Sequence, residues 1–479
     1  MDTSFQERSG LIRIAAADPQ QSPSNLRVEF HEAPPTPSLG TVPAQVGEVI
    51  LSQSTSGQST LRVSLGKDAG FAPEIFRQAG GALGKWLVKS GVENADLDLE
   101  PIFSRGQAHV SALLEGILLG AYQFTQYKNA KESPQTSTIF LWSTRPDLAE
   151  MIQRATKICA AVNLARDWAH EPANVINPLT LSERVKSLAK SDGLDFKVFD
   201  EAALTEMGAG GLLNVGKGSD TPPRLIIIEY AGSSPKPDAR PVIFVGKAIT
   251  FDTGGYSLKS TEGIKGMKYD KCGGTTVAAL LHLVSRLAIQ NPVIGIISAA
   301  ENMVSSNSYR PDDIIKMLSG KTVEITSTDA EGRLVLADAI AYAQNSYNPQ
   351  AIIDLATLTG GVVVSLGHVR AGLMSNNDDL AAKLFSAGES THERLWRLPL
   401  DGDFEKLLKG DDADLKNSGG REGHAILGGT FLKQFVSDDV PWAHLDIAGV
   451  AETDKELPYS PKGATGFGIR LLLEYLENL

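Results

Sequence analysis

Lysine and aspartate side chains are concentrated in one short segment whose composition suits a catalytic site. The segment follows the strand-like run 242–245 and contains Lys247, Asp252, Lys259 and Asp270. Ligands of open α/β sheets tend to bind just beyond the carboxyl ends of strands, and Lys247 and Asp252 are expected there. Two consecutive glycines follow soon after Asp252, and glycine permits a sharp chain reversal. We therefore expect Lys259 to return toward Asp252.

A second group of charged residues lies at 327–334, where the sequence reads STDAEGRL. Asp329, Glu331 and Arg333 alternate with other residues, so in an extended stretch their side chains would share one face. Two carboxylates on one face repel each other, and one guanidinium offsets only part of that repulsion. A bound metal would account for the arrangement. The competing interpretation of each residue alone is ordinary surface charge and, for Arg333, a salt bridge with Glu331.

Together the two segments offer four carboxylates, from Asp252, Asp270, Asp329 and Glu331. Oxygen ligands favour hard divalent ions such as magnesium or manganese, and zinc is also compatible. Four carboxylates can bridge two ions about 3.5–4 Å apart. A lysine in such a site either ligates a metal as a free amine or stabilises an oxyanion as an ammonium. For Asp270 alone, a competing role is to cap the predicted helix 274–288.

Other sequence motifs give no support for a different chemistry. Residues 211–217 (GLLNVGK) and 319–322 (SGKT) each match only part of a phosphate-binding loop. The sequence contains neither HExxH nor GxSxG, which argues against a helix-borne zinc protease and a nucleophile elbow. Its two cysteines, Cys159 and Cys272, fit a reducing compartment. A lone cysteine such as Cys272 is more often inert packing than a nucleophile.

Hydrophobic patterning indicates the elements that position these residues. Strands are expected at 26–30, 49–52, 61–65, 225–229, 242–245, 293–298 and 351–355, and helices at 71–90, 108–127, 147–169, 274–288 and 332–343. The later alternation of strands and helices indicates a parallel or mixed sheet covered by helices. We predict a small N-terminal α/β domain at 1–146, a helical connector at 147–175 and a larger domain at 176–479.

Composition restricts the class of protein. Of 479 residues, 42% are hydrophobic and 21% charged, with a formal net charge of −12; the balance is globular. An acidic chain is poorly suited to nonspecific nucleic-acid binding. The first 25 residues lack the basic start and apolar run of a signal peptide, and no apolar stretch is long enough to span a membrane. We expect a cytoplasmic protein without membrane or nucleic-acid partners.

The charged segments resemble those of the leucyl aminopeptidases, also called cytosol aminopeptidases, a family of two-metal peptidases. Seven of the eight residues at 327–334 match the family signature NTDAEGRL, and the stretches VGKAITFD at 245–252 and MKYD at 267–270 match in order and spacing. The resemblance covers nearly all of the C-terminal two-thirds, whereas the first hundred residues fit poorly. It implies a small N-terminal α/β domain plus a larger catalytic α/β domain with a mixed β-sheet flanked by helices. It also implies a homohexamer.

The resemblance further implies how two metal ions are held. Asp252 and Glu331 would bridge both ions. Lys247 and Asp270 would complete the tighter site, and Asp329 the more exchangeable one. The ions implied are Mn²⁺ or Zn²⁺, with Mg²⁺ as a third candidate. Two such cations lower the pKa of a shared water and create hydroxide near neutral pH.

The same resemblance assigns the remaining roles in hydrolysis of the N-terminal peptide bond. Lys259 would polarise the scissile carbonyl and stabilise the gem-diolate, and Arg333 would hold a bicarbonate ion that acts as general base. One ion would bind the free amine of the peptide substrate, which restricts the enzyme to N-terminal residues. A hydrophobic pocket predicts a preference for leucine-like residues. The residues expected to contact substrate are Met267, Thr357, Leu358 and Gly360.

Three positions depart from the family pattern, and two other functions remain open. Ser327 replaces the asparagine of the signature with a small expected effect, because both side chains can bond the local backbone. Ser257 and Lys271 put the shape of the pocket in doubt. A DNA-binding regulator or recombination accessory protein would need a basic arm, which the sequence lacks. A two-metal phosphoesterase commonly adds histidine ligands, and none of the eight histidines lies in the two segments.

Overall fold

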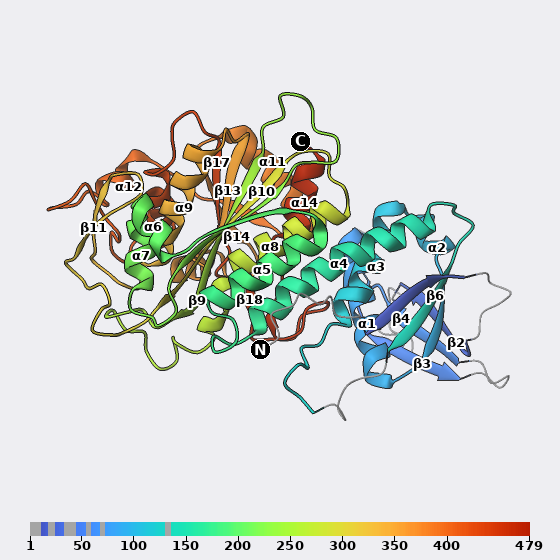
Figure 1. The fold of residues 1–479 in the computed structure, drawn as a ribbon. Coiled ribbons are helices and arrows are strands. Elements are labelled where there is room, and N and C mark those ends of the chain that lie inside the picture. Colours follow the sequence, from blue (N-terminus) through green and yellow to red (C-terminus); the bar gives the residue numbers. More distant parts are fainter. Residues whose placement is uncertain (1–10, 18–23, 33–44, 54–58, 68–71, 130–135) are drawn as a thin grey trace. The chain divides into compact units, whose positions relative to one another are not determined.

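The computed structural model describes residues 11–17, 24–32, 45–53, 59–67, 72–129 and 136–479. They form two compact units (Figure 1). The smaller unit runs to Asn163 and includes Thr453–Gly463, and the larger unit comprises Leu164–Glu452 and Ala464–Leu479. The domain boundaries that the sequence predicts stay predictions. Residue 71 of the first expected helix, and much of the N-terminal stretch that lacks the features of a signal peptide, lie outside the described residues.

The smaller unit is built on a six-stranded sheet in the order β1-β6-β5-β2-β4-β3. Its strands are β1 Ile12–Ala16, β2 Leu26–His31, β3 Val49–Gln53, β4 Ser59–Ser64, β5 Asn94–Asp98 and β6 Ser137–Trp142. Neighbouring strands are parallel, except that β3 runs antiparallel to β4. The strands expected at 26–30, 49–52 and 61–65 are confirmed as β2, β3 and β4.

Two helices of the smaller unit, α1 (Pro73–Ser90) and α3 (Gln107–Gly120), pack closely through glycines. A Cβ at Gly84 would lie 2.2 Å from the Ile117 carbonyl oxygen, so only glycine permits this approach. The helix predicted at 108–127 is too long, because the chain leaves α3 after Gly120 through a tight turn in which Tyr122 N donates to Leu119 O. The other helices here are α2 (Glu100–Phe103) and the first part of α4 (Leu148–His170).

The larger unit contains an eight-stranded mixed sheet in the order β15-β14-β17-β13-β9-β10-β8-β7. Its strands are β7 Asp195–Phe199, β8 Arg224–Tyr230, β9 Val242–Asp252, β10 Val293–Asn302, β13 Ala351–Ala356, β14 Ala371–Ser375, β15 Leu395–Arg397 and β17 Trp442–Asp446. The central strands β10, β9, β13 and β17 are parallel to one another. Strands β10, β13 and β17 are buried at every position, as expected of a sheet covered on both faces.

Helices cover both faces of this sheet (Figure 1). One group packs together as α5 Pro178–Asp192, α8 Cys272–Arg286, α11 Asp378–Thr391 and α14 Ile469–Glu477, and the other as α6 Glu201–Met207, α7 Gly210–Gly216, α9 Gly332–Ser346, α10 Gly360–Leu366, α12 Gly402–Lys406 and α13 His424–Lys433. The short elements are the 3₁₀ helix η2 Met267–Lys271 and the strands β11 Ile314–Lys316, β12 Thr322–Glu324, β16 Leu415–Lys416, β18 Glu452–Thr453 and β19 Gly463–Ala464.

Strand β9 is longer than the sequence suggested. The run expected at 242–245 continues to Asp252, so Lys247 lies inside the strand and Asp252 is its last residue. The extension pairs with β10, and a register shift after Ala300 places Asn302 opposite Asp252. Gly246 and Lys247 interrupt the hydrophobic run, and pairing with β10 outweighs this weak local propensity.

Candidate metal centre

Lys247 projects from the middle of β9 into a fully buried group of polar atoms. Its Nζ lies 2.8 Å from Asp270 Oδ1 and 2.9 Å from Glu331 Oε1, and its side chain is 2% exposed. Nζ also donates to the carbonyl oxygen of Thr357 at 3.0 Å. A Cβ at Gly332, the first residue of α9, would fall 2.5 Å from Lys247 Cε. The start of α9 therefore lies directly against the lysine side chain.

The chain reverses after β9 as the two glycines predict. Gly254 and Gly255 adopt positive φ angles of 84° and 61°, which are favourable only for glycine. Lys259 N then donates to Thr253 O at 2.9 Å, and Lys259 Nζ lies 2.8 Å from Asp252 Oδ2. The expected return of Lys259 to Asp252 is confirmed.

The second charged segment is a turn followed by a helix, so the expectation of an extended stretch is wrong. Residues 328 and 329 lie in a turn, and α9 begins at Gly332. The turn nevertheless brings carboxylates together: Asp252, Asp329 and Glu331 offer ligand atoms within 4.8 Å of one another. Asp329 Oδ1 also forms an ion pair with Lys259 Nζ. Side chains of other segments bond the backbone of this stretch: Asn417 Oδ1 accepts from Thr326 N and Ser327 N.

Asp270 belongs to the same cluster and caps no helix. It lies in η2, and its Oδ1 accepts hydrogen bonds from Lys247 Nζ at 2.8 Å and Thr357 Oγ1 at 2.7 Å. The N-cap of α8 is Lys271, without a side-chain capping bond. The structure thus brings together Asp270 and the residue on β9 that sequence spacing alone could not connect to it.

Burial sets the electrostatics of the cluster. Burial and the nearby Glu331 together raise the pKa of Asp270 to about 7 and that of Asp329 to about 6, against the lowering effect of the neighbouring lysines. Burial alone would lower the pKa of Lys247, but Asp270 and Glu331 raise it above its usual value. Asp252, Glu331 and Asp329 likewise raise the pKa of Lys259, although burial alone would lower it. The carboxylates are therefore crowded more tightly than two ammonium groups can fully compensate.

Two carboxylate oxygens provide a direct test of whether cations fit. Asp270 Oδ2 and Glu331 Oε2 are buried and have no hydrogen-bond partner among the residues that the structure describes. A buried acceptor left unsatisfied is destabilising by about 1–3 kcal/mol. Oxygen-rich donor sets of this kind suit divalent cations such as Mn²⁺ or Mg²⁺. The residues present therefore fit a divalent metal centre.

Arg333 lies in the first turn of α9, buried at 2% exposure. Its Nη1 donates to the Asn417 carbonyl oxygen at 2.8 Å, so the alternative that it serves Glu331 as a salt-bridge partner finds no support in the described ion pairs. Nε is buried and has no partner in the described part of the chain. Burial lowers the pKa of Arg333 to about 10, so the guanidinium remains charged at neutral pH and can hold an anion.

Of the four residues predicted to contact substrate, one bonds the cluster directly. Thr357 follows β13 and bonds both Lys247 and Asp270. The amides of Leu358 and Thr359 donate to Asp446 Oδ1 on β17 at 3.2 and 3.4 Å. Gly360 is the first residue of α10, and Met267 is the first residue of η2.

Several supporting residues were missed by the sequence interpretation. Asn302 Nδ2 donates to Asp252 Oδ1 at 2.8 Å and to Thr328 O at 2.9 Å, so it joins the two charged segments. Tyr309 Oη donates to the same carbonyl at 2.8 Å. Ser257 Oγ accepts from Thr328 N at 3.1 Å. Asn302 ends the strand beside β9, and the rule that ligands gather at strand ends could have identified it.

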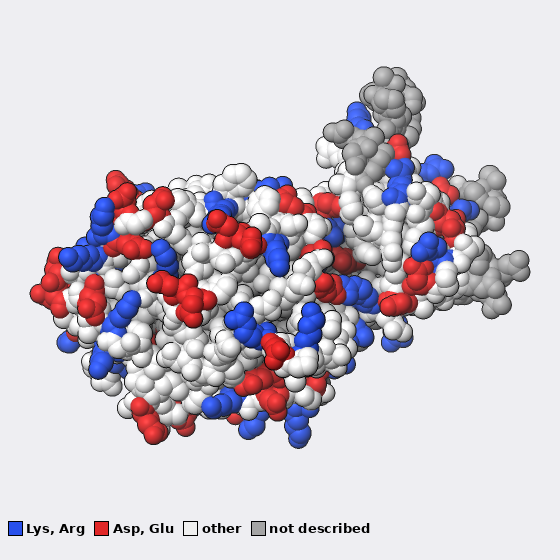
Figure 2. Space-filling model, turned by 90° about the horizontal axis from the view of Figure 1, so that it is seen from above, with Lys and Arg blue, Asp and Glu red and all other residues white. Residues whose placement is uncertain are grey.

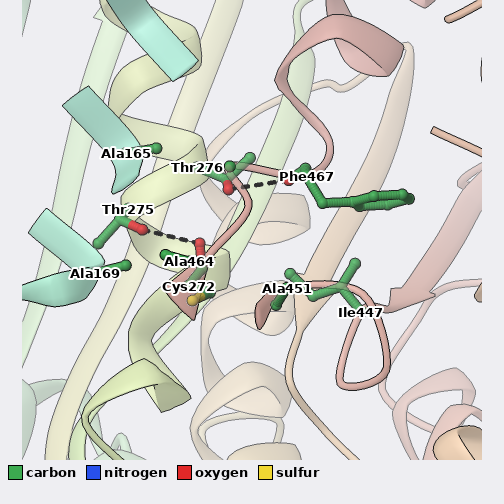
Figure 3. A pocket seen from close by; sticks show the side chains of 10 residues that line it. Ala165, Ala169, Cys272, Thr275, Thr276, Ile447, Ala451, Ala464 and Phe467 are labelled. Atoms are coloured by element: carbon green, nitrogen blue, oxygen red, sulfur yellow. Dashed lines mark hydrogen bonds between the residues drawn. The ribbon is translucent and has the colours of Figure 1, made fainter. Parts of the chain in front are cut away.

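Cys272 is a packing residue, as predicted. Burial raises the pKa of its thiol well above the usual value. It lines a cavity of about 10 Å³ together with residues such as Thr275, Thr276 and Phe467 (Figure 3). That volume admits about one water molecule, so the cavity cannot hold a peptide. Residues 211–216 lie in α7, which rules out a phosphate-binding loop there.

Side chains of both charges are mixed on one face of the molecule. On the face shown in Figure 2, lysine and arginine side chains are interspersed with aspartate and glutamate. Within the described ranges, no helix is both long and apolar enough to cross a membrane.

Comparisons with known proteins agree with the geometry. The catalytic-domain model of the cytosol aminopeptidase family matches residues 163–473, and its N-terminal-domain model matches 39–131. A probable cytosol aminopeptidase of Geotalea uraniireducens (strain Rf4) is 42% identical over 426 residues, 88% of this chain and 85% of that one. Another from Aquifex aeolicus (strain VF5) is 41% identical over 421 residues, 87% and 84% of the two chains.

A solved structure is similar along nearly the whole chain. The bottromycin maturation enzyme BotP, in complex with Mn, superposes with a TM-score of 0.86 at 33% identity and covers 95% of this chain and 99% of its own. The chain belongs to the cytosol aminopeptidase family and is a metal-dependent aminopeptidase.

Proposed function

We propose that this protein removes N-terminal residues from peptides with two divalent cations held by Lys247, Asp252, Asp270, Asp329 and Glu331. The observation that carries the proposal is a pair of buried oxygens, Asp270 Oδ2 and Glu331 Oε2, for which the described part of the chain provides no hydrogen-bond partner. In both residues the other carboxylate oxygen is ion-paired with Lys247. Cations would satisfy the two free oxygens and offset the repulsion among the carboxylates.

Manganese is the cation we propose first. The similar BotP structure was solved with Mn, and carboxylate ligands suit Mn²⁺ and Mg²⁺. Zinc remains a second candidate because lysine, as a free amine, is a nitrogen ligand. Bound cations of this kind supply hydroxide near neutral pH by lowering the pKa of a coordinated water.

Lys259 is the residue we assign to stabilise the oxyanion of the gem-diolate. Its side chain is 18% exposed, whereas that of Lys247 is 2% exposed. A substrate carbonyl can therefore reach Nζ of Lys259 but not Nζ of Lys247. A positive charge already fixed beside the reacting carbonyl stabilises the charge that develops there without reorganisation.

Arg333 is the residue we assign to hold a bicarbonate ion that accepts a proton during hydrolysis. Its buried guanidinium keeps Nε free of protein partners among the described residues, and arginine binds planar anions through paired N–H groups. The pKa of Arg333, lowered by burial to about 10, leaves the group charged at neutral pH.

The substrate side of the site is formed, in this proposal, by Met267, Thr357, Leu358 and Gly360. Leu358 packs against the buried core of the larger unit, and Met267 opens the helix that carries Asp270. Apolar side chains at these positions favour a hydrophobic, leucine-like N-terminal residue.

The assembly, the location and the domain limits are further parts of the proposal. We propose a cytoplasmic homohexamer, with the catalytic domain at 176–479, the connector at 147–175 and the N-terminal domain at 1–146. The relatives are named cytosol aminopeptidases. Light scattering on the purified protein tests the assembly.

A direct assay tests the activity. Leucine amide and a leucyl dipeptide should be hydrolysed with Mn²⁺ and not after treatment with EDTA, while a phosphomonoester and an N-acetylated dipeptide remain intact. Hydrolysis of the phosphomonoester alone would favour the phosphoesterase alternative. A gel-shift titration over a range of salt concentrations tests the DNA-binding alternative. If the protein binds DNA, a shifted DNA band is expected only at low salt.

The bridging role of Asp252 has its own test. Asp252→Asn keeps the side-chain volume but removes the charge, so it should weaken binding of both Mn²⁺ ions by more than roughly tenfold each. Calorimetry on metal-depleted protein measures both sites. Two sites of unchanged affinity would reject the bridging assignment.

A further inference from the structure

Lys271 is a buried lysine whose ammonium faces away from the metal centre. Its side chain is fully buried, and Nζ donates to the carbonyl oxygens of Ala169 at 3.1 Å and Glu171 at 2.8 Å. A third bond goes to the carbonyl of Lys268. The three N–H groups of an ammonium are thus matched by three carbonyl acceptors. Such full satisfaction is what makes a buried charge tolerable.

The neighbouring residues of η2 contact the same end of α4. Lys268 Nζ donates to the carbonyl oxygen of His170 at 2.8 Å. Tyr269 Oη lies 3.2 Å from His170 Nδ1, and the two rings stack edge to face at 5.5 Å. Three of the five residues of η2 therefore attach it to residues 169–171.

The carbonyls at the end of α4 are natural partners for these lysines. The last carbonyls of a helix lack intrahelical hydrogen bonds, and the helix dipole makes that end negative. Pro172 directly follows Glu171 and cannot supply an amide donor. The ammonium groups of Lys268 and Lys271 in η2 provide the donors that the backbone after α4 does not supply.

Asp270 is the residue of η2 whose side chain bonds toward the metal centre. It lies between Tyr269 and Lys271 in sequence, and its carboxylate is bonded by Lys247 and Thr357. The backbone of η2 is therefore held on one side by α4 while Asp270 reaches the cluster on the other. A shift of η2 along α4 would displace that carboxylate from the cluster.

We infer that Lys271, supported by Lys268, is a positioning residue that fixes Asp270 in the metal centre by clamping η2 to the carboxyl end of α4. The inference rests on the proposed function, in which Asp270 is a metal ligand. Lys271 does not touch substrate or metal in this assignment. The departure from the family at this position therefore affects metal affinity rather than the shape of the substrate pocket.

The test is Mn²⁺ calorimetry on metal-depleted full-length protein carrying Lys271→Met, which keeps the length of the side chain and removes its charge. One of the two Mn²⁺ sites should weaken by roughly 10–100-fold, as for loss of other groups that orient a ligand, while the other changes little. Turnover should recover when Mn²⁺ is raised to saturation. Lys265→Met is the matched control. Lys265 is exposed on the loop that precedes η2, and in the ion pairs described it pairs only with Glu262.

Lys268→Met provides a second variant should Lys271→Met not fold, because Lys268 is only half-buried and makes a single bond to α4. A smaller weakening of the same site is expected. Asp270→Asn identifies which site belongs to Asp270. The inference is overturned if the lysine variants weaken Mn²⁺ binding equally at both sites, or if saturating Mn²⁺ does not restore their turnover. Either result would show a merely structural role.

The two proposals fail in different ways. If Asp270→Asn weakens one site but neither lysine variant does, the clamp is overturned and the ligand assignment stands. If Asp270→Asn leaves both sites intact, the ligand assignment is overturned and the clamp with it.

Discussion

The metal centre has two halves built from the same residue types in different surroundings. The buried half consists of Lys247 with Asp270 and Glu331, whose side chains are 2–7% exposed. It lies between β9, η2 and the start of α9. Each acid has one oxygen ion-paired with Lys247 and one oxygen without a hydrogen-bond partner among the described residues.

The accessible half consists of Lys259 and Asp329, and Lys259 also pairs with the buried Asp252 at the end of β9. Lys259 is 18% exposed and Asp329 39%, and both lie on loops rather than on regular elements. Loops positioned by a rigid scaffold commonly carry the reacting groups. The same pairing of lysine with acids therefore anchors the site in one half and leaves a group within reach of substrate in the other.

The sharpest test of this difference is Lys247→Met. Removal of one partner from a buried ion pair leaves uncompensated charge, here on Asp270 and Glu331, so we expect the free energy of unfolding of the metal-free protein to fall by about 3–5 kcal/mol. Urea unfolding in EDTA measures it. Lys265→Met should change stability by less than about 0.5 kcal/mol. A stable Lys247→Met protein would erase the distinction between the halves.

Lys259→Ala should affect turnover instead of stability. Loss of one oxyanion donor typically reduces kcat by about 10²–10³, while a partly exposed side chain contributes little to the folded state. Steady-state kinetics with leucine amide and saturating Mn²⁺, together with a melting curve, separate the two effects. Wild-type turnover would remove Lys259 from its role.

Acid should stabilise the metal-free protein relative to neutral pH. Burial raises the pKa values of Asp270 and Asp329 to about 7 and about 6, above those of unfolded aspartate, so the folded state binds protons more tightly between about pH 4 and 7. The free energy of unfolding should therefore decrease, on the order of 1 kcal/mol, as pH rises through this window. Urea unfolding in EDTA at pH 5 and pH 7 measures the change, and Asp270→Asn should reduce it.

The smallest effect is expected at Ser327, on the loop of the accessible half. Its Oγ accepts from Asp329 N at 3.3 Å, and an asparagine side chain can make the same local bond. Ser327→Asn should therefore change kcat/KM by no more than about twofold. A tenfold change in kcat/KM would mean that the loop carrying Ser327 controls the reacting groups more tightly than the buried half of the metal centre does.

Local features of the fold could be predicted from the sequence. Gly254 and Gly255 predicted the return of Lys259 because a glycine turn is a local property. Helix α8 and strand β13 lie close to their predicted ranges because their hydrophobic patterns are strong and uninterrupted.

Contacts between distant segments were not predictable from patterning. The bond from Asn302 to Asp252 spans 50 residues and depends on the register shift in β10. The clamp of Lys271 on Glu171 spans 100 residues. The proximity of Asp270 to Glu331 could be predicted only from the resemblance to the family. Spacing in the sequence gives no information about which distant segments meet in the fold.

Asp446 has a consequence for synthesis of the chain on the ribosome. This residue, on β17, is the acceptor for the amides of Leu358 and Thr359, so the loop beside the metal centre lacks its anchor until most of the polypeptide has emerged. A growing chain that has not reached residue 446 carries all the proposed metal ligands but an unanchored loop. The loop at 357–359 therefore cannot take its final position before β17 joins the sheet beside β13.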